Sequence, residues 1–291
     1  MAVYKHNYRA YEGKLTPLHT RILVIVRYAF AEAWASKITI GLLTFCLLPC
    51  VISLVGIYLA NNPIARALVG AQGTRFLSID AAFFLKFLQS QCWLALVLAS
   101  WIAPRLVTFD LADNALPILL SHPITRFGYV LGKFTALFAT LSVITWIPAL
   151  LLFAYQGYSS PIPWAAENLR IAVGMLAGSV IWIAFISLLG LALSSWVKWR
   201  VLATGIIFAA IVVPAGVGGI VTGVLRTKWG FLLNLPFMMS SLWQRLLGAP
   251  VALRTPYSLP SEAIAAMLIL ASMVFIAMLN ARIRAREVVR G

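Results

Sequence analysis

Charged side chains are scarce in this sequence. Of its 291 residues only 11% are Asp, Glu, Lys or Arg, whereas 62% are hydrophobic. A soluble domain is roughly one quarter charged and one half apolar, so a chain of this composition would expose large apolar patches in water. The composition therefore predicts a protein that crosses a membrane several times.

The sequence also lacks the motifs of enzymes. Three histidines, His6, His19 and His122, are scattered, and neither G-x-S-x-G nor H-E-x-x-H occurs. The stretch GYVLGK at 128–133 is similar to a phosphate-binding loop, but only three residues separate its glycines and Phe134 follows its lysine. The required spacing and the hydroxyl that holds magnesium are both missing. We therefore expect no catalytic site and no nucleotide or other cofactor bound by this chain.

Metal-ligating groups are equally few. The three cysteines, Cys46, Cys50 and Cys92, fall in or beside apolar segments with no histidine or carboxylate nearby. We expect them to pack between helices and to form neither a disulfide nor a metal site. No charged residue falls at the middle of an apolar segment, which counts against transport driven by protons or sodium.

Six segments are long and apolar enough to span a membrane, because about 20 helical residues cross a hydrocarbon core of about 30 Å. They are 38–60, 83–107, 129–155, 169–197, 201–225 and 261–281. With six spans both termini lie on one side. Placing that side in the cytoplasm puts 15 Lys and Arg inside and 8 outside, as the positive-inside rule requires. The sequence thus predicts an all-α, six-span fold with cytoplasmic termini.

Two further segments are apolar without being spans. Residues 16–37 carry apolar side chains at helical spacing together with basic ones, which predicts an amphipathic helix at the membrane interface, beginning near Pro17. It is either a simple anchor or a docking surface for a cytoplasmic partner. Residues 229–248 are too short and interrupted to span, yet too apolar for water, and favour re-entrant or interfacial helices on the outer side.

Prolines and glycines within the spans predict bends and close packing. Pro49, Pro148 and Pro214 lie inside predicted spans. The pairs Gly174–Gly178 and Gly219–Gly223 have the small-residue spacing that lets helices approach closely, either within the bundle or between subunits. Pro214 with Gly219 and Gly223 predicts a bent or loosened fifth span.

The loop between the second and third spans, TFDLADNALPILLSHPITRFGYVLGK, is the most informative stretch. Asp110 and Asp113 are placed to cap a short helix at 111–120, because carboxylates favour helix N-termini. We expect Gly128 to begin the next span and Lys133 to reach back to the lipid headgroups. Taken alone, the loop is either a structured connector or a contact for a partner.

This loop resembles that of ABC-2 type transporter permeases, in the group that includes copper-enzyme-maturation and gliding-motility permeases. The matching residues are Asp110, Leu116, Pro117, Leu120, Ser121, Pro123, Arg126 and the run from Tyr129 to Lys133. The N-terminal stretch from Tyr11 to Pro17, with Arg21, Arg27 and Tyr28, is also similar to members of this group. His122 stands where an arginine or glutamine is frequent.

The resemblance implies a permease subunit whose loop region 110–122 acts as a coupling helix on a separate cytoplasmic ATPase, which itself binds ATP and magnesium. It also implies a second permease, identical or different, and an unidentified cargo. The residues that would face the ATPase are Asp110, Asp113, Leu116, Pro117, Leu119, Ser121, His122 and Arg126. Weaker candidates are Glu12, Lys14, Arg21, Arg27 and Glu32.

The expected location is the inner membrane of a bacterium. The net charge of +15 is explained by contacts with membrane lipid, and no nucleic-acid partner is expected. Two alternatives stay open at this point: a secondary transporter or channel that needs no ATPase, and a membrane scaffold within a larger complex.

Overall fold

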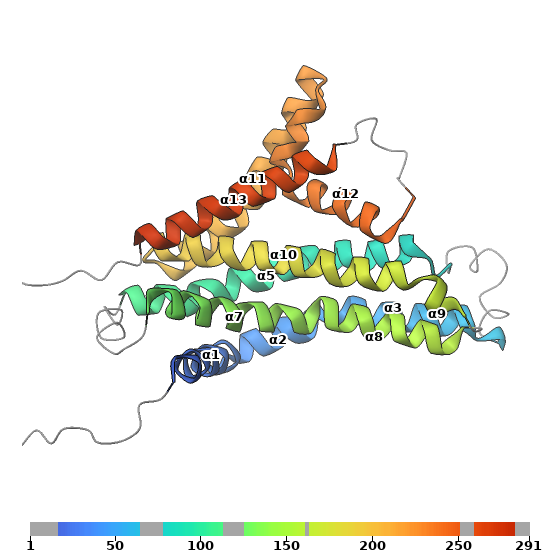
Figure 1. Ribbon diagram of the computed structural model, residues 1–291, viewed down its shortest axis with the longest axis horizontal. Helices are drawn as coiled ribbons and strands as arrows, with labels where there is room; N and C mark the ends of the chain where they lie inside the picture. Colours follow the sequence, from blue (N-terminus) through green and yellow to red (C-terminus); the bar gives the residue numbers. More distant parts are fainter. Residues whose placement is uncertain (1–16, 65–77, 113–124, 161–162, 251–258, 283–291) are drawn as a thin grey trace, which may run out of the picture.

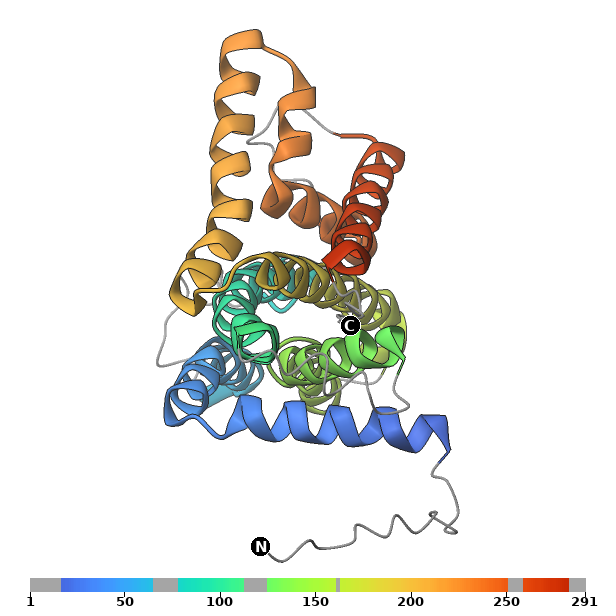
Figure 2. The ribbon, with the colours of Figure 1, turned by 90° about the vertical axis from the view of Figure 1, so that its left-hand side faces the viewer.

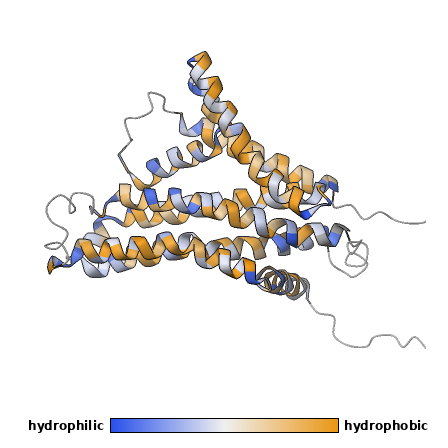
Figure 3. Cartoon of the chain, turned by 180° about the vertical axis from the view of Figure 1, so that it is seen from behind, coloured by the Kyte–Doolittle hydropathy of each residue, from blue (hydrophilic) through white to orange (hydrophobic). Residues whose placement is uncertain are grey.

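The computed structural model describes residues 17–64, 78–112, 125–160, 163–250 and 259–282. Within these ranges every regular element is helical, and six helical segments are long and apolar enough to cross a membrane. The all-α class and the six spans are therefore confirmed. Hydrophobic residues predominate along all six segments (Figure 3).

The first three spans include two broken helices. The first span consists of α2 (Lys37–Cys46) and α3 (Leu48–Asn61), the second is α5 (Ala81–Ala112), and the third consists of α7 (Arg126–Ile144) and α8 (Trp146–Ser159). Each break lies just before one of the prolines at which a bend is predicted, Pro49 or Pro148. Proline lacks the N–H that would bond four residues back, and its ring clashes with that carbonyl, so the helix ends and restarts.

The last three spans follow a single-turn helix, α9 (Trp164–Glu167). They are α10 (Leu169–Trp196), α11 (Arg200–Leu225) and α13 (Ser261–Arg282). Between α11 and α13 lie a 3-10 helix, η1 (Lys228–Leu233), and α12 (Leu235–Leu247). The α11 helix runs through Pro214 without interruption, so the predicted loosening of the fifth span is not seen as a break in the helix.

The spans α5, α7–α8 and α10 form the centre of the bundle (Figure 1). In the most apolar 18-residue stretch of α7–α8 and of α10, 61% of the residues are buried. The corresponding fraction is 22% in α11 and 17% in α13 and in α2–α3. The largest side chains of the core include Phe84, Leu96, Leu137 and Trp182, all less than 2% exposed. The three peripheral spans therefore present most of their apolar surface outward.

Close packing at glycines fixes α12 against α10. A Cβ atom at Gly174 would lie 2.9 Å from the backbone of Leu246, and one at Gly178 would clash with the indole of Trp243. The close helix contact predicted for this glycine pair is thus confirmed, and its partner is α12 of the same chain. The face of α12 that carries Met239 and Trp243 is buried. The depth of residues 229–248 in the membrane stays a prediction.

The α1 helix (Leu18–Trp34) runs across the direction of the spans near one end of the bundle (Figures 1 and 2). It begins after Pro17, as predicted. Its Ile22 and Ile25 pack on α7 at Gly128 and Gly132, where added Cβ atoms would lie 3.3 Å and 2.6 Å from their side chains. The predicted helix is therefore present, and its placement in the membrane interface stays a prediction.

Candidate functional site

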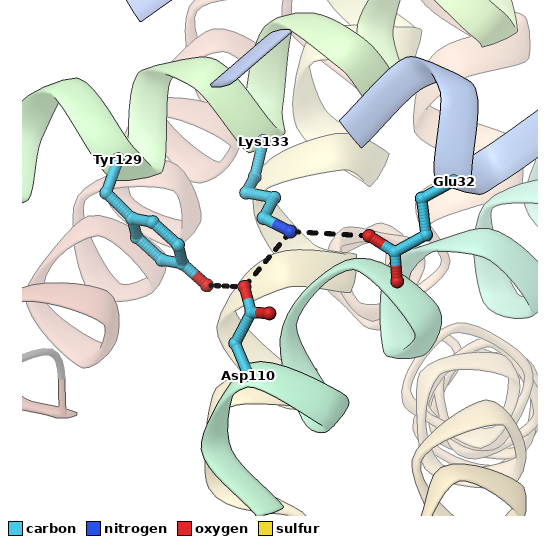
Figure 4. A network of polar contacts seen from close by, with 4 residues as sticks. All are labelled: Glu32, Asp110, Tyr129 and Lys133. Atoms are coloured by element: carbon cyan, nitrogen blue, oxygen red, sulfur yellow. Dashed lines mark hydrogen bonds and ion pairs between the residues drawn. The ribbon is translucent and has the colours of Figure 1, made fainter. Parts of the chain in front are cut away.

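Four polar side chains from three helices meet where α1 crosses the bundle (Figure 4). Lys133 Nζ lies 3.0 Å from Asp110 Oδ2 and 3.6 Å from Glu32 Oε2. The hydroxyl of Tyr129 donates a hydrogen bond of 2.7 Å to the same Asp110 oxygen. We call Glu32, Asp110, Tyr129 and Lys133 the Lys133 network.

Local helix geometry brings these groups together. Asp110 lies in the last turn of α5, and Tyr129 and Lys133 lie one turn apart at the start of α7, on one face. The start of α7 is fixed by Thr125, whose hydroxyl oxygen accepts a 3.0 Å hydrogen bond from the backbone N–H of Gly128. Because α1 approaches α7 closely at its glycines, Glu32 of α1 comes within reach of Lys133.

The network contains one strong ion pair and one weaker one. Lys133 is only 7% exposed, and burying an unpaired ammonium group would cost several kcal/mol. Its contact with Asp110 is short and is reinforced by the bond from Tyr129. The contact with Glu32 is longer, and that side chain is 39% exposed, so solvent screens it and its contribution is smaller.

Two predictions about these residues are wrong. Asp110 does not cap a helix beginning at 111, because α5 continues to Ala112 and the Asp110 carboxylate is engaged by Tyr129 and Lys133. Lys133 does not reach the headgroups. The carboxylates of Asp110 and Glu32 compensate its charge inside the bundle, and α1 packs beside it, so it stays buried.

The other candidate contacts are more dispersed. Of the predicted partner-facing residues, the structure brings together Asp110 and Glu32. Arg126 and Arg27 are exposed at the surface near the same end, and Arg21 belongs to α1. The remaining candidates lie outside the described residues and stay predictions: Glu12, Lys14, Asp113, Leu116, Pro117, Leu119, Ser121 and His122.

Sequence reasoning missed the structural role of Tyr129 and Lys133, although a signal was present. Asp110 and Lys133 have opposite charges and lie near the ends of two consecutive apolar helices. Consecutive antiparallel helices place such positions at the same level, where a carboxylate and an ammonium group pair readily. The partner from α1 had no comparable signal, because its contact depends on how the helices pack.

The glycines of the fifth span behave differently from those of the fourth. Cβ atoms added at Gly219 or Gly223 would meet nothing within 4 Å, so these residues make no close contact in the described chain. Gly218 instead lies against the carbonyl of Gly230 in η1. The roles predicted for Pro214, Gly219 and Gly223 in flexing or in contact with another subunit stay predictions.

A pocket of about 540 Å³ lies between α5, α11 and α12. Its lining combines neutral polar side chains with aromatic ones, and Gln89 Nε2 donates a 2.6 Å hydrogen bond to Ser240 Oγ across it. The lining residues are Gln89, Ser90, Cys92, Trp93, Ala215, Asn234, Pro236, Phe237, Ser240 and Trp243. None is charged, so the pocket suits a neutral group that accepts or donates hydrogen bonds.

Groups with metal-binding chemistry are not clustered in the part of the chain that the structure describes. No three His, Cys, Asp or Glu side chains there are grouped so as to hold a metal ion. Cys46, Cys50 and Cys92 are free thiols, of which Cys46 and Cys92 are buried.

Taken together, the fold and the site define a multi-pass α-helical membrane protein whose N-terminal helix is joined to the ends of two spans. A protein-family model described as "ABC-2 family transporter protein" matches residues 23–245, which run from α1 to α12 and make up well over half of the chain. The chain belongs to this family of ABC transporter membrane permeases, so the resemblance carried by the loop is confirmed. No curated protein shows a significant match to the chain.

Proposed function

We propose that this chain is the permease subunit of an ATP-driven transporter in a bacterial inner membrane, with both termini in the cytoplasm. In this proposal the loop that includes residues 113–124 receives the movement of a separate cytoplasmic ATPase. The observation that carries the proposal is the Lys133 network, which joins α1 to both helices that flank this loop.

The network gives the loop a defined mechanical connection. A force on the loop acts on the end of α5 and the start of α7, which the pair of Asp110 and Lys133 holds together. Glu32 links α1 to the same point. Because α5 packs along α10 and also contacts α11, a displacement of this unit reaches the centre of the bundle and the fifth span.

We infer a separate ATPase because no segment between the spans offers room for nucleotide hydrolysis. These segments are too short to form an ATP-binding domain. The stretch GYVLGK, which is similar to a phosphate-binding loop, forms part of the first turns of α7. Within the family, a permease of this kind is expected to act with a second permease and two ATPase subunits. The neutral pocket between α5, α11 and α12 is our candidate for part of the cargo path.

The first test is recovery of the ATPase. The tagged full-length chain, purified from its native cells in mild detergent with ATP and magnesium, is expected to retain an ABC ATPase subunit. The variant Leu116→Glu/Pro117→Glu/Leu119→Glu should lose that subunit, because three carboxylates would disrupt an apolar contact, while still inserting in the membrane.

A matched control places the same charge on the other side of the membrane. Ala67→Glu/Leu68→Glu/Val69→Glu should leave recovery of the ATPase unchanged. A stable wild-type protein that carries no ATPase in any nucleotide state would contradict the proposal. It would favour the secondary transporter, or the scaffold if other membrane proteins are recovered instead.

The second test concerns orientation. In a chain in which Cys46, Cys50 and Cys92 are replaced by alanine, Ser121→Cys is expected to react with a membrane-impermeant maleimide only in inside-out vesicles. Tyr158→Cys lies at the opposite end of the bundle on a residue that is 91% exposed, so it should react only in right-side-out cells. The reverse labelling of both positions would show that the termini lie outside.

A further inference from the structure

Two arginines from different spans converge on one tryptophan. The guanidinium carbon of Arg200, the first residue of α11, lies 4.5 Å from the ring centre of Trp101, and that of Arg105 lies 5.9 Å from it. Arg105 and the indole N–H of Trp101 both donate to the hydroxyl of Thr39 in α2, at 3.4 Å and 3.2 Å. We call Trp101, Arg105 and Arg200 the arginine cluster.

The arginine cluster has two positive charges and no compensating carboxylate among the residues that the structure describes. Among the described residues, the ion pairs within 4 Å are the two that Lys133 makes with Glu32 and Asp110, away from the arginine cluster. One terminal nitrogen of Arg200, Nη2, is buried without a hydrogen-bond partner. A tryptophan ring offsets part of the repulsion between two guanidinium groups, but it does not satisfy their N–H donors. An anion would compensate the positive charge of the arginine cluster and accept hydrogen bonds from its N–H donors.

The helix end adds donors to the same place. The α11 helix begins at Arg200, and its N-cap residue, Trp199, makes no side-chain capping bond. The first backbone N–H groups of a helix are unpaired and carry the positive end of its dipole, which favours a phosphate. Lys198, exposed one residue further out, increases the positive charge.

An apolar groove continues from the arginine cluster into the span. It has a volume of about 580 Å³ and follows the first turns of α11 beside Trp199, Arg200, Val201, Leu202, Gly205, Ile206 and Ala209. At Gly205 an added Cβ would meet nothing within 4 Å, so the groove is open there. Val201 is 86% exposed on this surface. A hydrocarbon chain would cover this apolar groove, whereas a free inorganic anion would occupy only the arginine cluster.

We propose that the arginine cluster binds the phosphate of an anionic phospholipid, with one acyl chain lying along the groove on α11. Two guanidinium groups that form no ion pair with the described residues favour a headgroup with net negative charge over a zwitterionic one, which brings its own cation. The lipid would join α2, α5 and the start of α11. The inference rests on the proposed function in one respect: the cytoplasmic orientation of the termini places this lipid in the cytoplasmic leaflet.

The test uses the full-length permease without any ATPase, so its outcome is independent of the coupling proposal. Native mass spectrometry and thermal unfolding in detergent would compare added phosphatidylglycerol with phosphatidylcholine of the same chains. We expect phosphatidylglycerol to be retained and to raise the Tm, and Arg105→Gln/Arg200→Gln to weaken its binding at least tenfold. The control Arg27→Gln/Arg126→Gln removes two exposed charges near the same end and should bind normally.

A second variant separates the headgroup from the chain. Gly205→Leu fills the groove without changing charge, and it should weaken binding of the diacyl lipid while leaving the fold intact. Equal stabilisation by inorganic phosphate would overturn the proposal in favour of a simple anion site. Equal retention of phosphatidylcholine, or unchanged binding by the Arg105→Gln/Arg200→Gln variant, would show only non-specific lipid at the surface.

Discussion

Replacing Lys133 by methionine is expected to lower the free energy of unfolding by about 2–3 kcal/mol. Removing one partner of a buried ion pair costs about 3–5 kcal/mol, and the partial exposure of Asp110 reduces this cost. Methionine keeps most of the volume but leaves the Asp110 carboxylate with Tyr129 as its remaining partner in the network. Thermal unfolding of the purified protein should show a fall in Tm of several degrees, at about 2–4 °C per kcal/mol.

Two control variants distinguish loss of charge pairing from loss of packing. Asp110→Asn/Lys133→Met should recover most of the stability, because no uncompensated charge remains and the asparagine oxygen can still accept from Tyr129. Glu32→Gln should cost less than about 1 kcal/mol, since that pair is longer and more exposed. A double variant as unstable as Lys133→Met would show that the lysine acts through its volume alone.

Replacing Gly178 by valine is expected to detach α12 from α10, at a cost of about 3 kcal/mol or more. The Cβ atom would lie 2.5 Å from Nε1 of Trp243 and closer still to its Cδ1. The indole is 1% exposed and lies directly against Gly178, so the added side chain must push it, and with it α12, away from α10. Trypsin should then cleave rapidly after Arg245 in α12, and gel filtration should show aggregation.

The matched control is Gly219→Val, which introduces the same side chain into α11, where an added Cβ would contact nothing within 4 Å. It should leave trypsin resistance unchanged. Adding Trp243→Ala to Gly178→Val should restore part of the resistance, because the smaller side chain makes room. Equal cleavage of the Gly178→Val and Gly219→Val variants would rule out this contact as the cause.

The spans could be predicted because a membrane imposes a simple rule on sequence. About 20 apolar residues are needed wherever a helix crosses, and that length is visible locally. The helices break beside Pro49 and Pro148, whereas α11 runs through Pro214, so the prolines mark where a helix can break but not whether it does. The family resemblance likewise depended on a short local motif around Pro117 and Gly132, which the family match now supports across most of the chain.

The site was harder to predict because its interactions join residues far apart in sequence. Asp110 looked like a capping residue, since local rules favour a carboxylate before a short helix. The structure instead places it against Lys133, and only the fold of two helices onto each other creates that option. The same holds for Gly178, whose spacing predicted a close contact but could not identify Trp243, more than 60 residues later, as the partner.

The unequal burial of the spans has a consequence for biosynthesis. The third and fourth spans are mostly enclosed by their neighbours, whereas the fifth and sixth bury about one fifth of their most apolar residues. A ribosome delivers the chain from its N-terminus, so α5, α7–α8 and α10 are available to pack before α11 has been made. The core of the bundle then forms early, and α12 and α13 close over α10 only after α11 has been made.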